Sequence, residues 1–183
     1  MVSANVDYPT DAGLLAKAVR RIGRIVRRVK ATGAATRTRC PDHTRAAGRR
    51  ARQIASKLRL RGAQAKDEAQ QVVRQATAAL ARLASRSAAD AQAVLRNARR
   101  ALRTTTGRRG GQLRRAVHEL ATTIQATTLV AAQARSRLAG VMPDAAGRVV
   151  SLHDRDARPI VRGRLGRPAS SATRPRSATT TTA

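Results

Sequence analysis

The chain has 183 residues, enough for one domain or two small ones, and carries 38 Lys and Arg against 10 Asp and Glu, a formal net charge of +28. With Tyr8 as its single aromatic residue, it cannot be a base-stacking module, which needs several aromatic platforms. One cysteine excludes a disulfide framework, and no apolar run approaches the roughly 20 residues that a membrane-spanning helix requires.

The first elements are a short β-prone entry and an amphipathic helix. Residues 1–9 are expected to be strand-like and end at a proline, which disfavours helix immediately before it. Thr10 or Asp11 can then cap a helix. Apolar residues recur at helical spacing as far as Val29, with arginines on the opposite face, so the helix is expected to end near Lys30.

Two further helices are predicted after a basic connector at 32–41. The first runs from Asp42 to about Arg61. The second is alanine-rich and runs from Gln64 to about Arg103, with an interruption around residues 85–89. The inner side of the first is expected to consist of Ala47, Ala51, Ile54, Ala55 and Leu58.

A Thr- and Gly-rich turn at 104–111 separates the alanine-rich helix from a last helix that is predicted to end at Ala139. Because the turn is short, the two long helices should fold back as an antiparallel hairpin. A short strand is predicted near 148–152, and the Ser/Thr/Ala-rich residues 169–183 are expected to be disordered. The expected fold is mainly α, a hairpin or loose bundle of long antiparallel helices.

Two stretches at the ends of the helical region are distinctive. Residues 2–17 read V-S-A-N-V-D-Y-P-T-D-A-G-L-L-A-K, and residues 137–168 read R-L-A-G-V-M-P-D-A-A-G-R-V-V-S-L-H-D-R-D-A-R-P-I-V-R-G-R-L-G-R-P. The first resembles the block that many DDE-type insertion-sequence transposases carry after their first strand, and the second resembles their re-entry into the catalytic core. Between them, T-R-T-R-C-P-D-H-T-R-A-A-G-R-R-A-R-Q-I-A resembles the arginine-rich helical insertion of that family.

The resemblance implies a division of the chain into four parts. These are a strand-like entry at 1–9, a basic helical insertion at 10–140, a strand and loop re-entry at 141–168, and a disordered tail at 169–183. The catalytic core of the resembling family is RNase H-like, and its Asp-Asp-Glu triad binds Mg²⁺ for attack on a DNA phosphodiester. The family pattern places these acidic residues before residue 1 and after residue 168. No catalytic, metal-binding or cofactor-binding residue and no activity is therefore expected in this chain.

The tail is expected to result from a frameshift near Pro168. The family continues at this point with a sequence like E-F-G-Y-K-A-Q-V. The codons GCG AGT TCG GCT ACA AGG CCC AGG TCG encode A-S-S-A-T-R-P-R-S, the residues that follow Pro168. The same bases, read from the third position onward, encode E-F-G-Y-K-A-Q-V. The chain is then predicted to be a truncated transposase fragment.

Arginine clusters are the strongest signal that the residues themselves give. Each arginine that neutralises a phosphate releases condensed counterions, so DNA is the expected partner, bound without sequence-specific readout. The alternative for these residues is a solvated basic face. The candidate DNA-binding residues are Arg20, Arg21, Arg24, Arg27, Arg28, Arg37, Arg39, Arg45, Arg49, Arg50 and Arg52.

The alternative function is a small architectural, nucleoid-type DNA-binding protein. An intact transposase or a second copy of the chain is a further expected partner, whereas a membrane or a small-molecule substrate is not. The expected location is the cytoplasm, on the nucleoid when DNA is bound.

Other chemistry-bearing residues point more strongly to structural roles. Asp154 and Asp156 lie two apart among arginines, so a loop with solvated ion pairs is favoured over a metal site. Cys40 and His43 have the spacing of half a zinc site, but a structural zinc needs four ligands. His118 is expected on the surface of the last helix. Glycines form no phosphate-binding loop pattern.

Overall fold

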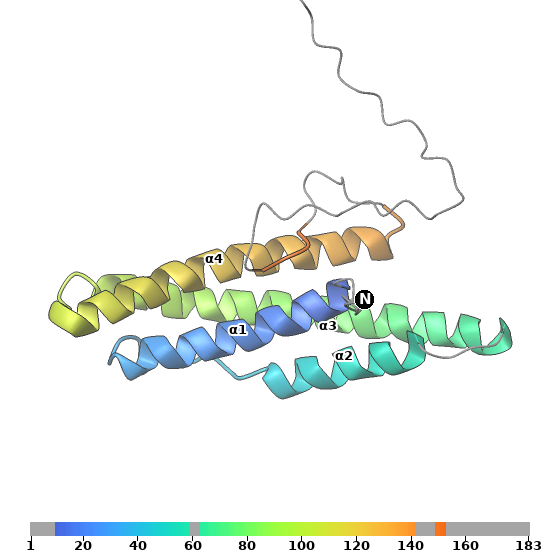
Figure 1. The fold of residues 1–183 in the computed structure, drawn as a ribbon, viewed down its shortest axis with the longest axis horizontal. Helices are drawn as coiled ribbons and strands as arrows, with labels where there is room; N and C mark the ends of the chain where they lie inside the picture. Colours follow the sequence, from blue (N-terminus) through green and yellow to red (C-terminus); the bar gives the residue numbers. More distant parts are fainter. Residues whose placement is uncertain (1–9, 59–62, 142–148, 153–183) are drawn as a thin grey trace, which may run out of the picture.

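The computed structural model describes residues 10–58, 63–141 and 149–152. The predicted strand at 1–9 and the predicted tail at 169–183 lie outside these ranges. The described part is mainly helical, as the periodicity predicts (Figure 1). Its helices are α1 (Asp11–Ala31), α2 (Thr44–Leu58), α3 (Ala63–Ala101) and α4 (Gly107–Leu138).

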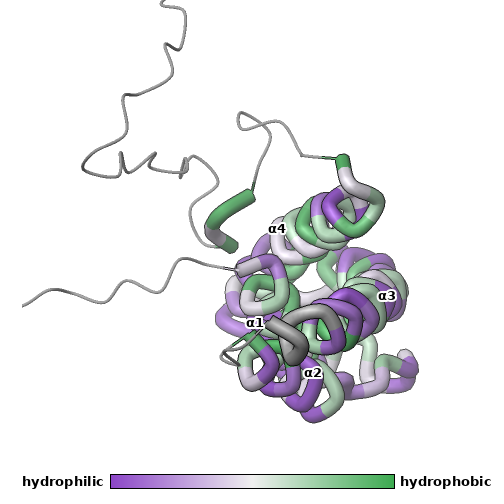
Figure 2. The backbone as a smooth tube through the Cα atoms, turned by 90° about the vertical axis from the view of Figure 1, so that its right-hand side faces the viewer, coloured by the Kyte–Doolittle hydropathy of each residue, from purple (hydrophilic) through white to green (hydrophobic). Residues whose placement is uncertain are grey.

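The bundle is organised around the α1–α3 pair, because each of these two helices packs against the other three. Helices α2 and α4 each contact α1 and α3 but not each other, so they lie on opposite sides of the α1–α3 pair (Figure 2). The chain reverses between α3 and α4, and the two helices run side by side in opposite directions (Figure 1). The predicted antiparallel hairpin is therefore confirmed.

Helix α1 begins where its sequence predicts. The Thr10 hydroxyl oxygen accepts a hydrogen bond from the Gly13 backbone N–H at 3.1 Å, which satisfies one of the free amides of the first turn. Asp11 lies in that turn and basic residues lie in the last one, which complements the helix dipole at both ends. Its apolar face is almost fully buried, with Leu15, Ile25 and Val29 completely inaccessible.

The interruption predicted in the third helix at residues 85–89 is wrong, because α3 is continuous from Ala63 to Ala101. Ala84, Ala88 and Ala91 are buried there. Alanine has the highest helix propensity, and packing of this narrow face against the neighbouring helices outweighs the preference of nearby serines for turns.

The core consists of two clusters along the length of the bundle. One joins the first half of α1 to α2, the middle of α3 and the second half of α4. The other joins the second half of α1 to the last part of α3 and the first half of α4. Helix α4 also buries Thr123 and Thr127, whose hydroxyls each donate to the backbone carbonyl four residues earlier at 2.7 Å. These bonds allow a threonine-rich helix to lie inside the bundle.

Helix α2 is less deeply packed than its sequence predicts. Ala47 and Ile54 are buried and Ala51 is half-buried. In contrast, Ala55 is exposed and the Leu58 side chain is 61% exposed, so these two residues do not belong to its inner side. The helix lies at the edge of the bundle. Its buried residues, Ala47 and Ile54, are seven apart and form one narrow stripe that faces α1 and α3.

The strand predicted near 148–152 is also wrong for its described part, since residues 149–152 pair with no strand in the described ranges. Their backbone groups bond to helix side chains instead. The Val149 N–H donates to the Gln133 side-chain oxygen at 3.1 Å, and the Leu152 carbonyl accepts from Arg21 at 3.2 Å. Leu152 is buried in the core.

A buried network connects this segment to the start of α1. The Asp11 carboxylate, 8% exposed, accepts hydrogen bonds from Gln133 at 2.7 Å and from Arg137 at 2.8 Å. Gln133 is also the residue that holds Val149. Thr10, where the chain enters the helical bundle, and residue 149 therefore lie near each other at one end of the molecule.

The turn between α3 and α4 depends on two glycines. Gly107 has φ +61, a left-handed conformation that costs glycine little. Gly110 is buried, and a Cβ atom there would overlap the Thr105 carbonyl group of the turn. Gly111, the next residue, has only the end of the Arg115 side chain within 4 Å of its Cβ position.

We expect Gly110→Ala to destabilise the fold by about 1–3 kcal/mol, because the turn backbone must move away from the added methyl group. Gly111→Ala should leave stability unchanged or raise it by up to about 1 kcal/mol, since alanine favours the helical state. Urea unfolding followed by circular dichroism measures both. Equal effects of the two substitutions would contradict the packing of this turn.

Candidate nucleic-acid interface

Three of the candidate arginines pair with carboxylates of other elements. Arg28 and Arg21 of α1 both pair with the Glu119 carboxylate of α4, at 2.6 Å and 3.3 Å. Arg27 pairs with Asp42 of the connector at 3.2 Å. The Arg21 side chain is only 22% exposed and also bonds to the backbone of residue 152. We infer that Arg21 and Arg28 are mainly structural, whereas Arg27, 67% exposed, makes an ion pair on the surface.

The other candidate arginines differ in their surroundings. Arg50 is half-buried and donates to the Ala46 carbonyl at 3.3 Å. The rest are exposed and pair with no carboxylate in the part of the chain that the structure describes. These are Arg20, Arg24, Arg37, Arg39, Arg45, Arg49 and Arg52.

Four of the exposed arginines line one groove between α1 and α2, with a volume of about 590 Å³. Small side chains, mostly alanine and glycine, leave its floor open, and no carboxylate lines it. The lining residues of this groove, the α1–α2 groove, are Ala16, Arg20, Thr44, Arg45, Gly48, Arg49, Ala51, Arg52 and Ala55.

The α1–α2 groove concentrates positive potential at one place on the surface. Arg45, Arg49 and Arg52 follow one another at helical spacing on α2, and Arg20 faces them from α1. Guanidinium groups bind phosphate through paired N–H donors, so a row of them fits a sugar–phosphate backbone. The groove can therefore hold successive phosphates without contact to a base.

A second arginine cluster lies at the α3–α4 turn and was missed by the sequence reasoning. Residues 91–118 contain no Asp or Glu, a signal that is visible in the sequence. Its arginines are all exposed. They define the hairpin surface: Arg96, Arg99, Arg100, Arg103, Arg108, Arg109, Arg114 and Arg115.

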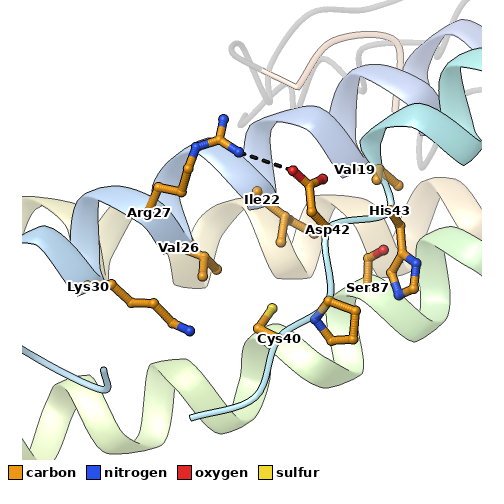
Figure 3. Close-up of a pocket in the computed structure, with 11 residues that line it drawn as sticks. Val19, Ile22, Val26, Arg27, Lys30, Cys40, Asp42, His43 and Ser87 are labelled. Atoms are coloured by element: carbon orange, nitrogen blue, oxygen red, sulfur yellow. Dashed lines mark hydrogen bonds and ion pairs between the residues drawn. The ribbon is translucent and has the colours of Figure 1, made fainter. Parts of the chain in front are cut away.

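Cys40 and His43 both line a cavity of about 160 Å³ beside α1 and α3 (Figure 3). The His43 Nε2 atom lies 3.6 Å from the Asp90 carboxylate and makes no hydrogen bond, and neither does the buried Ser87 hydroxyl. Across the described ranges, no three His, Cys, Asp or Glu side chains are grouped to hold a metal ion.

The remaining sequence-predicted residues have simple positions. His118 is exposed on α4, as predicted. Asp154 and Asp156 lie outside the described residues. Within the described ranges, no helix has the combined length and apolar character needed to cross a membrane.

No protein-family model, curated protein or solved structure matches this chain. The resemblance to DDE-type transposases remains a prediction from the residues quoted above.

Cys40, the chain's single cysteine, lines this cavity, and we expect the cavity to slow its reaction with an alkylating reagent. Burial raises the pKa of the Cys40 thiol above its usual value, and the nearby Asp90 carboxylate raises it further. Less thiolate is then present near pH 8 in the folded protein than in the unfolded chain. Alkylation by iodoacetamide should be slower in the native protein than in urea, and the difference should shrink as the pH rises above the native pKa.

Mass spectrometry of timed samples measures this rate, and the same chain in urea is its control. The raised thiol pKa also affects the free energy of unfolding. Its contribution to stability is fully present below the pKa of Cys40 in the unfolded chain and is lost as the pH rises through the pKa of Cys40 in the folded protein. A native thiol that reacts as fast as the unfolded one would contradict the burial of Cys40.

Proposed function

We propose that this chain binds double-stranded DNA through its phosphates, with the α1–α2 groove as the principal contact and without reading base sequence. One observation carries the proposal: Arg20, Arg45, Arg49 and Arg52 surround an open groove without a carboxylate partner among the described residues. Repulsion within an unpaired row of guanidinium groups, in a chain of net charge +28, is relieved most effectively by a bound polyanion.

A duplex fits this surface better than a single strand. Single-strand binders stack bases on aromatic side chains, and the chain has Tyr8 alone. On α2 the groove arginines lie between Arg45 and Arg52, about 10 Å of helix, and a row of this length can meet successive phosphates of a duplex. Guanidinium contacts to phosphates position a protein but do not distinguish sequences.

The broader proposal is that the bundle is the helical insertion of a DDE-type transposase. The adjacency of the two ends of the bundle, held by Asp11, Gln133 and residues 149–152, supports it. An insertion between neighbouring elements of another domain needs its entry and exit close together. Under this proposal the chain lies on the nucleoid in the cytoplasm and cuts no DNA itself. An intact transposase or a second copy is its further partner.

The second candidate is an architectural DNA-binding protein. The observation that favours it is the hairpin surface, because arginines on more than one side of a small bundle can organise DNA without any catalytic core.

The α1–α2 groove predicts how DNA affinity depends on salt. The triple variant Arg45→Gln/Arg49→Gln/Arg52→Gln should reduce the slope of log K against log salt by about 2.7, since each lost phosphate contact contributes about 0.9. Fluorescence anisotropy of a labelled duplex between 50 and 200 mM salt, roughly the range in which such contacts change affinity most visibly, measures the slope.

The matched control is Arg74→Gln/Arg82→Gln/Arg86→Gln, which removes the same charge from exposed positions on α3 that line neither surface. The slope of log K against log salt should change by less than about 0.9 in this control, the contribution of one phosphate contact. An equal change in both variants would contradict a specific role for the groove and indicate a uniform charge effect. Absence of any duplex binding by the unaltered chain would overturn the proposed function.

The transposase proposal predicts the nucleotide sequence of the gene. In the alternate frame, the bases after the Pro168 codon should encode E-F-G-Y-K-A-Q and continue into further acidic blocks, and an in-frame Asp codon should precede the start. Sequencing the locus with a few hundred bases on each side tests this. A stopped or unrelated alternate frame would contradict the fragment proposal and favour the architectural protein.

A further inference from the structure

We propose that the hairpin surface is a second duplex-binding site, so that one chain bridges two DNA segments. The inference rests on the proposed DNA binding through the α1–α2 groove and adds a second DNA partner on a different surface of the same bundle.

Each surface includes one outer helix, α2 or α4, and these two helices lie on opposite sides of the molecule, whereas the other half of the hairpin surface lies on or just after α3 of the central pair. Helix α2 carries three of the four arginines of the α1–α2 groove, and α4 carries half of the hairpin surface. These two helices do not contact each other, and the α1–α3 pair lies between them (Figure 2). A straight duplex that lies in the α1–α2 groove therefore cannot also follow the outer side of α4.

The surfaces are also separated along the bundle axis. His43 lies beside Asp90, which places the start of α2 level with that point of α3. From there α2 runs in the direction opposite to α3 (Figure 1). At 1.5 Å per residue, Arg49 lies about 9 Å to one side of this level and Arg100 about 15 Å to the other. Arg49 and Arg100 are therefore about 24 Å apart along the axis, and Arg45 and Arg96, which lie nearer to this level, are about 12 Å apart.

The hairpin surface is electrostatically unfavourable without a ligand. Arg108 and Arg109 lie in the first turn of α4, where the helix dipole already presents positive charge, and that turn contains no acidic residue. The Thr106 side chain makes no capping hydrogen bond. The first turn of α1, in contrast, is capped by the Thr10 side chain and contains the acidic residue Asp11. The arginines at α4 therefore cost helix stability, and a bound polyanion would offset that cost.

The test is capture of a second duplex. A biotinylated duplex is fixed on streptavidin beads, a labelled free duplex is added with the full chain, and the retained label is measured at protein concentrations where sedimentation shows a monomer. Arg108→Gln/Arg109→Gln/Arg114→Gln should lower the retained label by about tenfold or more, because the second duplex loses three phosphate contacts. Its affinity for one duplex at low salt should change by less than about threefold, since the groove is intact.

The matched control is again Arg74→Gln/Arg82→Gln/Arg86→Gln, with circular dichroism to show that all variants are folded. It should retain capture within about twofold, since it removes equal charge outside both surfaces. Equal loss of capture in the control, unchanged capture in the hairpin variant, or capture that occurs only with a dimer would overturn the bridging proposal. Single-duplex binding without capture overturns bridging alone, whereas no binding to either duplex overturns the proposed function as well.

Discussion

The Glu119 carboxylate holds two guanidinium groups of α1 at the interface with α4, and the close packing of these two basic helices depends on that neutralisation. Helix α1 is one of the two central helices, yet one of its sides carries arginines at nearly every turn. Packing α4 beside that side would place like charges together without the carboxylate at 2.6 Å from Arg28 and 3.3 Å from Arg21. Asp11, Asp42 and Asp90 act similarly, each contacting a cationic or protonatable side chain across a helix or connector boundary.

This use of scarce carboxylates separates structural arginines from arginines that are free to bind. Asp11, Asp42, Asp90 and Glu119 lie at interfaces between elements, and no carboxylate lines the α1–α2 groove or lies within residues 91–118 at the α3–α4 turn. The small residues on the α2 side add an open floor, because alanine and glycine leave space between the guanidinium groups and the backbone. The α1–α2 groove thus arises from the same alanine-rich composition that gives the helices their propensity.

Individual helices could be predicted because their signals are local. The Thr10 cap, the apolar spacing of α1 and the glycine-rich turn before α4 each act within a few residues. The errors occur where packing outweighs local preference. Serines predicted to break α3 lie in a continuous helix, and residues 149–152 bond to Gln133 and Arg21 instead of a neighbouring strand. A strand needs a partner edge, and local sequence does not show whether one is present.

The sequence by itself determined that this protein is helical, strongly basic and almost free of aromatic residues, because composition and periodicity are properties of the chain. Only the tertiary structure decided which arginines pair with a carboxylate and which stay exposed. Arg28 and Glu119 are 91 residues apart, and Arg137 and Asp11 are 126 apart, so no local pattern predicts their pairing. Arg49 and Arg28 belong to similar arginine-rich stretches, yet one lines an open groove and the other binds a carboxylate across a helix interface. Free and structural charges differ only in what the fold places beside them.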